Sequence, residues 1–553
     1  MSALGVVASG PAADAIAVAV PALLEAQFAS RLFAQDATLW GEEAESESAI
    51  RLSWVNLART SRPLLGEIAA MRDQLRGEGV DRVVLCGMGG SSLAPEVICA
   101  TAGVDLVVLD SSQPDMVRSA LVDLERTVVV VSSKSGSTVE TDSQRRAFRA
   151  AFEEKGIDPT ARIVVVTDPG SPLDEEARSG GYRVVNADPN VGGRYSALTA
   201  FGLVPSGLAG ADIEALLDDA EAVADVLSAD DDGNPGLRLG AAMAATDPLR
   251  DKLVLVDDGS GIVGFPDWAE QLIAESTGKQ GTGILPVVVG STDDPEAAWP
   301  DPDVTVVRLT GDDDTEPTDE VVRADRSEIA VSGPLGAQLL LWEVATAAAG
   351  RLLGINPFDQ PDVESAKKAA RTLLDQGMGS SDEPAATDGA VEIRALGGTW
   401  LGGATTVPQA LEALFGQLDA DRGYLAVMAY LDRLADADLA SVRPGLARRT
   451  HRPVTFGWGP RFLHSTGQFH KGGPATGVYL QVTTAPHEDL AVPGREFSFG
   501  DFVAAQAAGD AQVLAEHHRP VLQLHLTDHD AGLAQVREAL SAPAAGPDAK
   551  GSA

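Results

Sequence analysis

Short runs of apolar residues alternate with longer amphipathic stretches over the first part of the chain. The runs VVLCG, VDLVVL, TVVVVS and RIVVVT each come before a stretch with helical periodicity. Consecutive β-branched residues without polar alternation indicate strands that are covered on both faces. This order of strands and helices predicts a doubly wound parallel sheet, which makes residues 81–228 a first α/β domain.

The same order returns after the acidic turn SADDDGNPG, with KLVLVDD, ILPVVVG and VTVVRLTG as the next apolar runs. They predict a second α/β domain of the same kind over residues 236–374. Its longest apolar stretch, from Leu335 to Leu353, has nearly the length of a membrane span. Because the stretch contains Glu343 and Arg351, we expect a buried helix instead.

The rest of the chain divides by composition. Residues 1–80 carry helical patterns and are predicted to be a helical segment, and the Gly, Ser, Asp and Pro of residues 375–390 predict a linker. Residues 391–540 contain strand patterns at GYLAVMAYL, PVTFGW, GVYLQVTT and VLQLHL, so we expect a C-terminal mixed α/β piece. The tail, residues 541–553, lacks large apolar residues and is predicted to be disordered.

The composition is that of a globular protein, with 553 residues, 44% of them hydrophobic, and a net charge of −39. The acidic excess argues against nucleic acid or an anionic membrane as a partner, and an anionic substrate would need locally clustered cations. Cys86 and Cys99 are the only cysteines, which excludes a disulfide framework and the usual zinc spacings. The N-terminus has no basic stretch of the kind that begins a signal peptide, so a cytoplasmic location is predicted.

A cluster of small hydroxyl residues follows the most apolar strand pattern, in the sequence TVVVVSSKSGSTVET. Ser133, Lys134, Ser135 and Thr138 lie between this predicted strand and a predicted helix that begins near Glu140. Unpaired loop amides, hydroxyl donors and the positive end of a helix dipole together favour an anion such as a phosphate group. An ordinary serine-rich turn with a helix cap is the alternative.

A second glycine-rich turn, GMGGSS, follows the first apolar run, and its Gly90 and Ser91 allow a ligand to approach the backbone closely. The turn is similar to a dinucleotide fingerprint, but Ser92 stands where the third glycine is required. The pair Gly278 and Lys279 lacks the Ser or Thr of a nucleotide-binding P-loop. We therefore predict no cofactor.

Several further residues have side chains that suit proton transfer or anion binding. Glu275 ends an amphipathic helix beside a glycine turn, where a carboxylate can act as a general base or simply lie on the surface. Arg194 follows two glycines and suits either an anion clamp or a structural ion pair. His464 and His470 lie close together without a metal-binding spacing, which favours proton transfer over zinc. Lys367 can act as an acid, as a charge partner or as a surface lysine.

Six segments together resemble the phosphoglucose isomerase family, whose members contain paired sugar-isomerase (SIS-type) domains. They are GMGGSSLAPE, SSKSGSTVET, GGRYS, ESTGKQG, LHSTGQ and NPFDQPDVESAKK. These segments are similar to the family's glycine turn, phosphate loop, arginine segment, glutamate segment, histidine segment and late glutamine–lysine helix. The resemblance covers residues 83–468 and implies two SIS-type domains with parallel sheets.

Taken residue by residue, the resemblance implies a complete sugar-phosphate site. The residues that would hold the phosphate are Gly90, Ser91, Ser133, Lys134, Ser135 and Thr138. Glu275 would move a proton between C2 and C1, and Arg194 would stabilise the enediolate. His464 would assist ring opening, while Lys367 and Gln360 would contact the ring oxygen and nearby hydroxyls.

The order of two segments departs from the usual family pattern, in which the histidine segment precedes the glutamine–lysine helix. Here Gln360 and Lys367 come before His464. This order resembles the isomerase half of transaldolase–phosphoglucose isomerase fusion proteins. The stretch before residue 83 is too short to form a transaldolase barrel.

The resemblance implies a metal-free aldose–ketose isomerase that interconverts glucose 6-phosphate and fructose 6-phosphate in glycolysis and gluconeogenesis. A sugar phosphate is the expected partner, and a homodimer is the expected assembly. Two alternatives stay open: a dual phosphoglucose/phosphomannose isomerase, and a sugar-phosphate-binding module without turnover. A carboxylate base at Glu275 would distinguish an enzyme from such a module.

Overall fold

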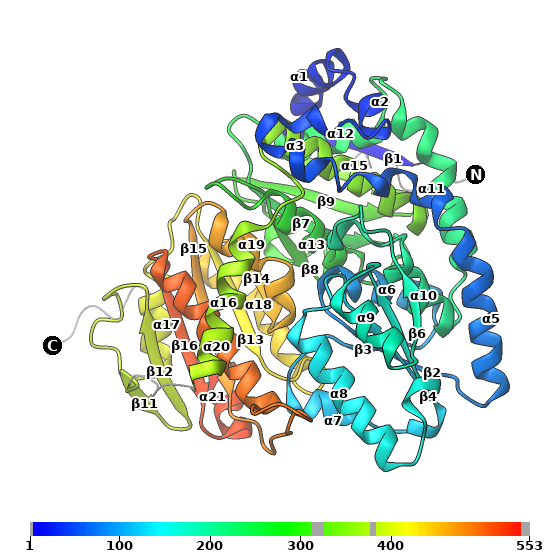
Figure 1. The fold of residues 1–553 in the computed structure, drawn as a ribbon. Helices are drawn as coiled ribbons and strands as arrows, with labels where there is room; N and C mark the ends of the chain where they lie inside the picture. Colours follow the sequence, from blue (N-terminus) through cyan, green and yellow to red (C-terminus); the bar gives the residue numbers. More distant parts are fainter. Residues whose placement is uncertain (1–3, 312–325, 377–382, 543–553) are drawn as a thin grey trace.

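Three β-sheets with helices on their faces organise the described part of the chain in the computed structural model (Figure 1). The structure describes residues 4–311, 326–376 and 383–542. Part of the predicted linker, residues 377–382, and nearly all of the predicted tail lie outside these ranges. Among the described helices, none combines the length and the apolar character needed to cross a lipid bilayer.

The first sheet is entirely parallel and has the strand order β3-β2-β4-β5-β6. Its strands are β2 Arg82–Gly87, β3 Val107–Leu109, β4 Thr127–Ser132, β5 Ile163–Thr167 and β6 Arg183–Asn186. Its helices are α6 Leu93–Ala102, α7 Pro114–Ala120, α8 Val139–Glu154, α9 Pro172–Ser179 and α10 Ala200–Ala209. Every residue of the central strand β4 is buried, as consecutive β-branched residues between two helical layers require.

The second sheet has the order β1-β10-β9-β7-β8 and is parallel except for its edge strand β1. Its strands are β1 Gly5–Ser9, β7 Lys252–Asp258, β8 Leu285–Val289, β9 Val304–Thr310 and β10 Glu328–Ser332. Its helices are α11 Ile213–Ser228, α12 Pro235–Ala244, α13 Phe265–Thr277, α14 Pro295–Ala298 and α15 Leu335–Leu353. The prediction of an α/β fold with doubly wound parallel sheets is confirmed.

The first residues of the chain correct one prediction, because the N-terminal segment is not purely helical. β1 pairs antiparallel with β10, and the helices follow it. Those helices are α1 Pro11–Glu25, α2 Phe28–Phe33, α3 Glu42–Ser48, α4 Leu57–Thr60 and α5 Pro63–Gly77. Five residues with a short apolar run suit a strand or a helix equally well, and only the free edge of β10 decides between them.

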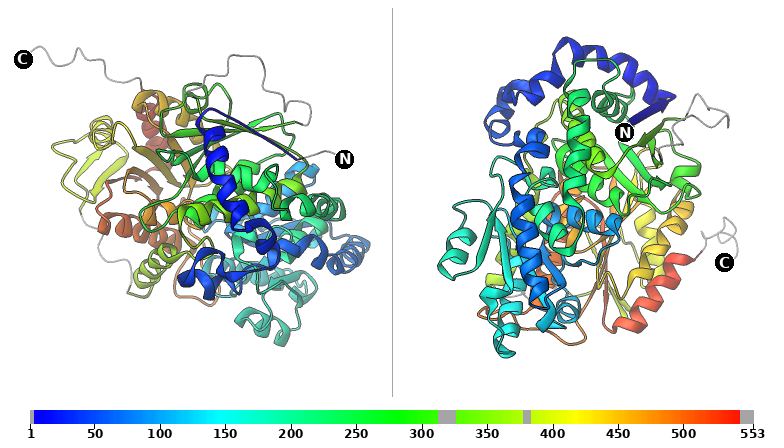
Figure 2. Two further views of the ribbon diagram at one scale, coloured as in Figure 1. Left: turned by 90° about the horizontal axis from the view of Figure 1, so that it is seen from above. Right: turned by 90° about the vertical axis from the view of Figure 1, so that its right-hand side faces the viewer.

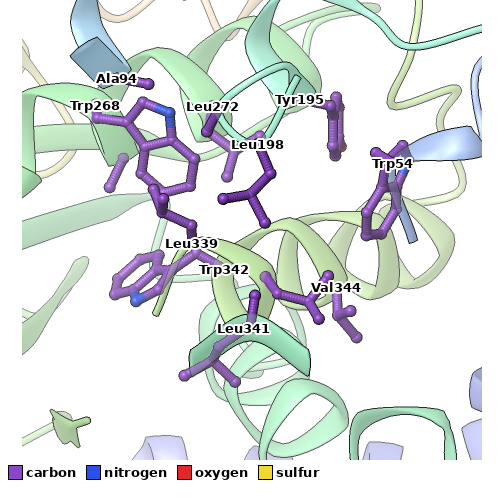
Figure 3. Packing of buried hydrophobic residues seen from close by; sticks show 14 of the residues in the cluster. Trp54, Ala94, Tyr195, Leu198, Trp268, Leu272, Leu339, Leu341, Trp342 and Val344 are labelled. Carbon is purple, nitrogen blue, oxygen red and sulfur yellow. The ribbon is translucent and has the colours of Figure 1, made fainter. Parts of the chain in front are cut away.

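α15 lies at the centre of the largest hydrophobic core, which the first two domains and the N-terminal helices share. Figure 3 shows Trp342 and Leu339 of this helix near Trp268 and Leu272 of α13. The first sixteen residues of α15, including Glu343, are all buried. The expectation of a buried helix at this position is therefore confirmed.

The third sheet has the order β11-β12-β16-β15-β13-β14. Strands β14, β13, β15 and β16 are parallel, and β12 pairs antiparallel with both β16 and β11. Its strands are β11 Ala386–Asp388, β12 Val391–Leu396, β13 Tyr424–Tyr430, β14 Val454–Trp458, β15 Gly477–Thr484 and β16 Val521–Leu526. Its helices are α17 Val407–Phe415, α18 Arg443–Thr450, α19 Gly467–Gly472, α20 Phe499–Glu516 and α21 His529–Ser541. β11 and β12 are missing from the sequence prediction, and β11 lies within the predicted linker.

Helix α1 packs against α12 of the second domain, away from the third sheet, whereas α5 packs against α10 of the first domain (Figure 2). Helix α16, Pro361–Gln376, connects the second domain to the third and packs against α20. One face of the third sheet packs on α18 through Leu446, and the opposite face packs on α20 through Leu514. The two connections that start at the neighbouring strands β13 and β15 therefore leave on opposite faces of the sheet.

Candidate active site

The hydroxyl-rich loop lies between β4 and α8, at the carboxyl edge of the first sheet (Figure 1). The hydroxyls form two pairs, with Ser133 Oγ donating to Thr138 Oγ1 at 3.2 Å and the Ser135 and Ser137 oxygens 2.8 Å apart. Gly136 has a φ of +68°, and a Cβ there would lie 2.6 Å from the Leu173 Cβ. The loop therefore needs glycine at its tip, and it presents hydroxyls at the positive end of α8.

A cavity of about 280 Å³ opens beside this loop. Its lining residues include Ser135, Ser137, Thr138 and Glu140 from the loop and α8, Val363, Lys367, Ala370 and Arg371 from α16, His464 and Lys471, and Phe502 and Gln506 from α20. Three parts of the chain that are far apart in sequence thus form one pocket. Of the sequence-predicted residues, the structure brings Ser135, Thr138, Lys367 and His464 to this cavity.

Cationic side chains cluster around the cavity although the whole chain is strongly acidic. Lys367 and Arg371 lie one turn apart on α16, so both reach the same side. The Lys471 ammonium lies 2.5 Å from a carboxylate oxygen of the buried Asp510. Lys134 is not among the lining residues, because its ammonium pairs with Asp168 at 2.5 Å.

Glu140 joins the first domain to the third through two contacts. Its Oε1 lies 3.2 Å from His464 Nε2 and accepts a hydrogen bond from Gln506 Nε2 at 2.7 Å. Burial raises the pKa of this carboxyl, but the hydrogen bond and charge of His464 and the charge of Lys367 outweigh burial and hold the pKa below its usual range. Glu140 therefore stays ionised and can orient the imidazole.

The C-terminal half of α13 presents a second set of groups behind His464. Gln271 and Glu275 lie one turn apart, and Gln271 Nε2 donates to Glu275 Oε2 at 3.1 Å and to the carbonyl of His464 at 2.7 Å. Trp268 and Leu272, on the adjacent side of α13, are buried in the core and fix the helix rotation (Figure 3). Gln271 is thus the bridge between the carboxylate and the histidine segment.

Arg194 is buried, and its guanidinium contacts both the end of α13 and the loop formed by residues 357–360. Its Nη1 lies 3.2 Å from Glu275 Oε1 and donates to Gln360 Oε1 at 2.8 Å, while its Nε donates to Ser276 Oγ at 2.7 Å. Its Nη2 donates to the carbonyl of Pro357 at 2.7 Å. The guanidinium is therefore immobilised with one edge against the carboxylate of Glu275.

Lys279 holds the other side of the loop that carries Gln360. Its ammonium lies 2.7 Å from Asp359 Oδ1 and donates to the Asn356 carbonyl at 2.8 Å. Burial lowers the pKa of Lys279 to about 8, and the nearby charge of Arg194 lowers it further, while Asp359 opposes the shift. The sequence relates Lys279 only to the P-loop pattern, whereas the structure gives it this anchoring contact.

The glycine turn after β2 packs tightly against the arginine segment. A Cβ on Gly90 would lie 1.9 Å from the Gly193 carbonyl oxygen, so no other residue fits there. Gly90 thereby sets the position of the segment Gly193–Tyr195 that carries Arg194. Neither Gly90 nor Ser91 lines the cavity.

The start of α16 is anchored by Gln468 of the histidine segment. Gln468 Oε1 accepts hydrogen bonds from the Asp362 amide at 3.0 Å and the Val363 amide at 3.2 Å. Its Nε2 donates to the Gly278 carbonyl at 2.9 Å. The histidine segment itself consists of the helical turn Arg461–His464 followed by α19.

Seven of the predicted site residues fall into two groups that Gln271 connects, and Gly90, Ser91, Ser133 and Lys134 belong to neither. Ser135, Thr138, Lys367 and His464 line the cavity, and Arg194, Glu275 and Gln360 form the buried cluster next to it. His470, the second histidine of its segment, is buried 3.0 Å from the Tyr424 hydroxyl and belongs to the core.

Several residues that line the cavity have no assigned role in the sequence prediction, among them Glu140, Arg371 and Gln506. Glu140 directly follows the hydroxyl cluster, and the one-turn spacing of Arg371 from Lys367 is a readable signal. Gln506 lies in an alanine-rich helix and carries no local signal. Within the described ranges, no group of three or more His, Cys, Asp and Glu side chains could hold a metal ion.

Comparison with known proteins gives a match to the family model described as phosphoglucose isomerase, over residues 69–241. This range includes the hydroxyl loop and Arg194, whereas Glu275, Lys367 and His464 lie beyond it. The chain is also similar to a protein named "Probable glucose-6-phosphate isomerase" from Haloarcula marismortui. The two are 31% identical over 360 residues, which cover 57% of this chain and 82% of the relative.

Solved structures show the same fold. A hypothetical protein from Thermus thermophilus superposes with a TM-score of 0.57 at 25% identity, covering 67% of this chain and all of that one. A glucose-6-phosphate isomerase from Chlamydia trachomatis superposes with a TM-score of 0.54 at 20% identity, covering 66% of this chain and 87% of that one. Both similarities agree with the α/β architecture of parallel sheets described above.

Proposed function

Because the chain belongs to the glucose-6-phosphate isomerase family, we propose that it interconverts glucose 6-phosphate and fructose 6-phosphate through an enediolate. The substrate phosphate would lie at the hydroxyl loop, and the sugar would extend towards Glu275. Charge and hydrogen-bond donors support this orientation, because Ser135, Thr138 and the positive end of α8 all face the cavity.

Glu275 is the proposed base. Its carboxylate would take the proton from C2 of the open-chain aldose and return it to C1, while the proton of the O2 hydroxyl passes to O1, which leaves the carbonyl at C2 and forms the ketose. The negative charge that develops on the enediolate oxygens would be stabilised by Arg194, whose Nη1 already lies 3.2 Å from the same carboxylate. A proton that moves between adjacent carbons in this way needs no redox partner.

Opening of the sugar ring is assigned to His464 and its partner Glu140. The ionised Glu140 lies 3.2 Å from His464 Nε2, so it can stabilise the imidazolium that forms when His464 accepts a proton. Lys367 on the facing wall can donate a hydrogen bond to the ring oxygen. Gln360, held by Arg194, would contact a neighbouring hydroxyl.

The contact between Arg194 and Glu275, joined to His464 through Gln271, is the observation that carries the proposal. A coupled assay tests it: purified protein with fructose 6-phosphate, with glucose 6-phosphate followed through its NADP-linked dehydrogenase, in the presence of EDTA. EDTA-resistant turnover is expected. No turnover, with fructose 6-phosphate still raising the melting temperature, would instead support a binding module without catalysis.

A dual phosphoglucose/phosphomannose isomerase stays a second candidate, because both substrates share the phosphate and the enediolate. A parallel reaction with mannose 6-phosphate distinguishes the two enzymes. We also propose a homodimer and a cytoplasmic location, and light scattering of the purified chain measures the first. The order of Lys367 before His464 supports a relation to the isomerase half of transaldolase fusion proteins.

A further inference from the structure

A second cavity, of about 440 Å³, opens in the third part of the molecule. Its lining residues come mainly from α20 and from the strands β12, β15 and β16 of the third sheet. Its volume falls in the range of about 300–1,000 Å³ that is usual for small-molecule sites. None of its lining residues lines the sugar-phosphate cavity.

One end of this cavity reaches a place in the sheet where α/β proteins bind ligands. Tyr430 and Thr484, the last residues of β13 and β15, both line it. The connection after β13 leaves on one face of the sheet and the connection after β15 leaves on the other. Such a change of side opens a crevice at the carboxyl ends of the two strands, where ligands of open α/β sheets bind.

The lining carries charges of both signs. On β12, Arg394 Nη2 donates to Glu392 Oε2 at 2.7 Å, so a cation and an anion stand side by side. On β15 and β16, Thr483 Oγ1 and His525 Nδ1 lie 3.0 Å apart. Burial lowers the pKa of His525, Glu392 opposes this shift and Arg394 adds to it, so the imidazole is neutral. With Glu383, the charged residues sum to one net negative charge, which disfavours a phosphorylated ligand.

The opposite wall is apolar and almost without protruding side chains. It consists of the α20 residues Val503, Ala504, Ala507, Ala508 and Ala511. Ala504 and Ala508, one turn apart, are partly exposed to the cavity. A ligand that fits this cavity therefore has an apolar body next to a pair of opposite charges.

We propose that this cavity is a regulatory site for an α-amino acid with an apolar side chain. The carboxylate of such a zwitterion would bind Arg394, its ammonium group would bind Glu392, and its side chain would lie on the alanine wall of α20. Phosphorylated sugars carry the wrong charge for this site, so the two cavities select different ligands.

Helix α20 connects the second cavity to the first, because its residues line both. Ala504 and Ala508 face the new cavity, while Phe502 and Gln506 of the same helix line the sugar-phosphate cavity. Gln506 donates to Glu140, which in turn lies against His464. A ligand that moves α20 would change this contact, and this regulatory part of the inference rests on the proposed isomerase function.

Calorimetric titration tests the site directly. Each proteinogenic amino acid is titrated into the full chain, with inorganic phosphate as an anionic probe, and again after saturation with fructose 6-phosphate. We expect one apolar amino acid to bind per chain in both conditions, and phosphate not to compete with it. Absence of binding by every amino acid, or complete displacement by fructose 6-phosphate, would overturn the proposal.

Two variants locate the binding. Ala508→Phe fills the cavity, and Arg394→Met removes the cation at its mouth; each should weaken amino-acid binding by about tenfold or more. Gln512→Phe, an exposed position on the same helix, is the matched control and should keep the wild-type affinity. Wild-type affinity in both cavity variants would overturn the assignment, and circular dichroism checks that each variant is folded.

Initial rates with and without a saturating amino acid test the coupling. A change of about fivefold in KM for fructose 6-phosphate is expected, and by linkage fructose 6-phosphate binding should change the amino-acid affinity by a similar factor. If an amino acid binds but neither KM nor kcat changes, the regulatory role is overturned. If the chain has no isomerase activity, the titrations still decide whether the site exists, so the two failures are distinguishable.

Discussion

The two cavities on either side of α20 have one wall in common but are built in different ways. The sugar-phosphate cavity takes its lining from the first domain, from α16 and from the third part, and several cations surround it. Among the described residues, the lining of the second cavity comes from positions between 383 and 525 and carries charges of both signs. The first therefore exists only when the parts of the chain are docked, whereas the second is a property of one sheet and its helix.

Glu275→Gln should have the largest effect on the first cavity and none on the second. The amide keeps the size of the side chain but cannot take a proton, so kcat should fall by roughly 10²–10⁴-fold while fructose 6-phosphate still binds. The coupled assay and a binding titration measure the two effects, and Glu214→Gln, at an exposed position, is the control. Near-normal kcat would remove Glu275 as the base, and amino-acid binding at the second cavity should be unchanged.

The combined change of Ser135→Ala and Thr138→Ala removes two phosphate donors from the first cavity only. Because a hydrogen bond to a charged group contributes about 1.5–3 kcal/mol, we expect KM for the phosphosugar to rise by roughly a hundredfold. Initial-rate kinetics measure it. The exposed Ser179→Ala is the matched control, and an unchanged KM in the double variant would contradict the phosphate-loop assignment.

Lys279 tests how the loop beside the first cavity is held. Its pKa of about 8 in the folded chain lies below the ordinary 10.5, so the folded state loses this proton first. Between these two values the unfolded chain binds more protons, and the free energy of unfolding should rise with pH by up to about 1.4 kcal/mol per unit. Urea unfolding of the wild type and of Lys279→Met from pH 7 to pH 11 measures how the free energy of unfolding changes with pH. The variant should lack this rise. Equal slopes in the two proteins would contradict the low pKa of Lys279.

Glu140→Gln has the smallest expected effect. The folded-state pKa of Glu140 lies below its ordinary value of 4.5, so its ionised form stabilises the fold above pH 4.5. That contribution, about 1 kcal/mol, is lost as the pH falls through the folded-state pKa. Melting temperatures of wild type and variant should therefore differ at neutral pH and converge in acid, whereas Glu154→Gln on the exposed end of α8 should show no difference. A difference that persists in acid would contradict the linkage.

Features that depend on neighbouring residues can be predicted from the sequence, and features that depend on distant contacts cannot. The run TVVVVS predicts a buried strand and the hydroxyls after it predict an anion-binding loop, because both signals are local in sequence. β1 could not be assigned in the same way, since its five residues suit either structure until the edge of β10 is known. The contact between His464 and Glu140 joins residues that are 324 positions apart, and no periodicity connects them.

The sequence by itself determined the alternation of strands and helices, the residues with candidate chemistry and the resemblance of their segments to one family. Each of these depends on side-chain type and short spacing, which the chain carries before it folds. The tertiary structure alone decided that Gln271 joins Glu275 to the histidine segment, that Gln506 reaches Glu140, and that α20 separates two cavities. Those contacts arise where separately folded parts meet, and docking depends on the shape of whole surfaces rather than on any local pattern.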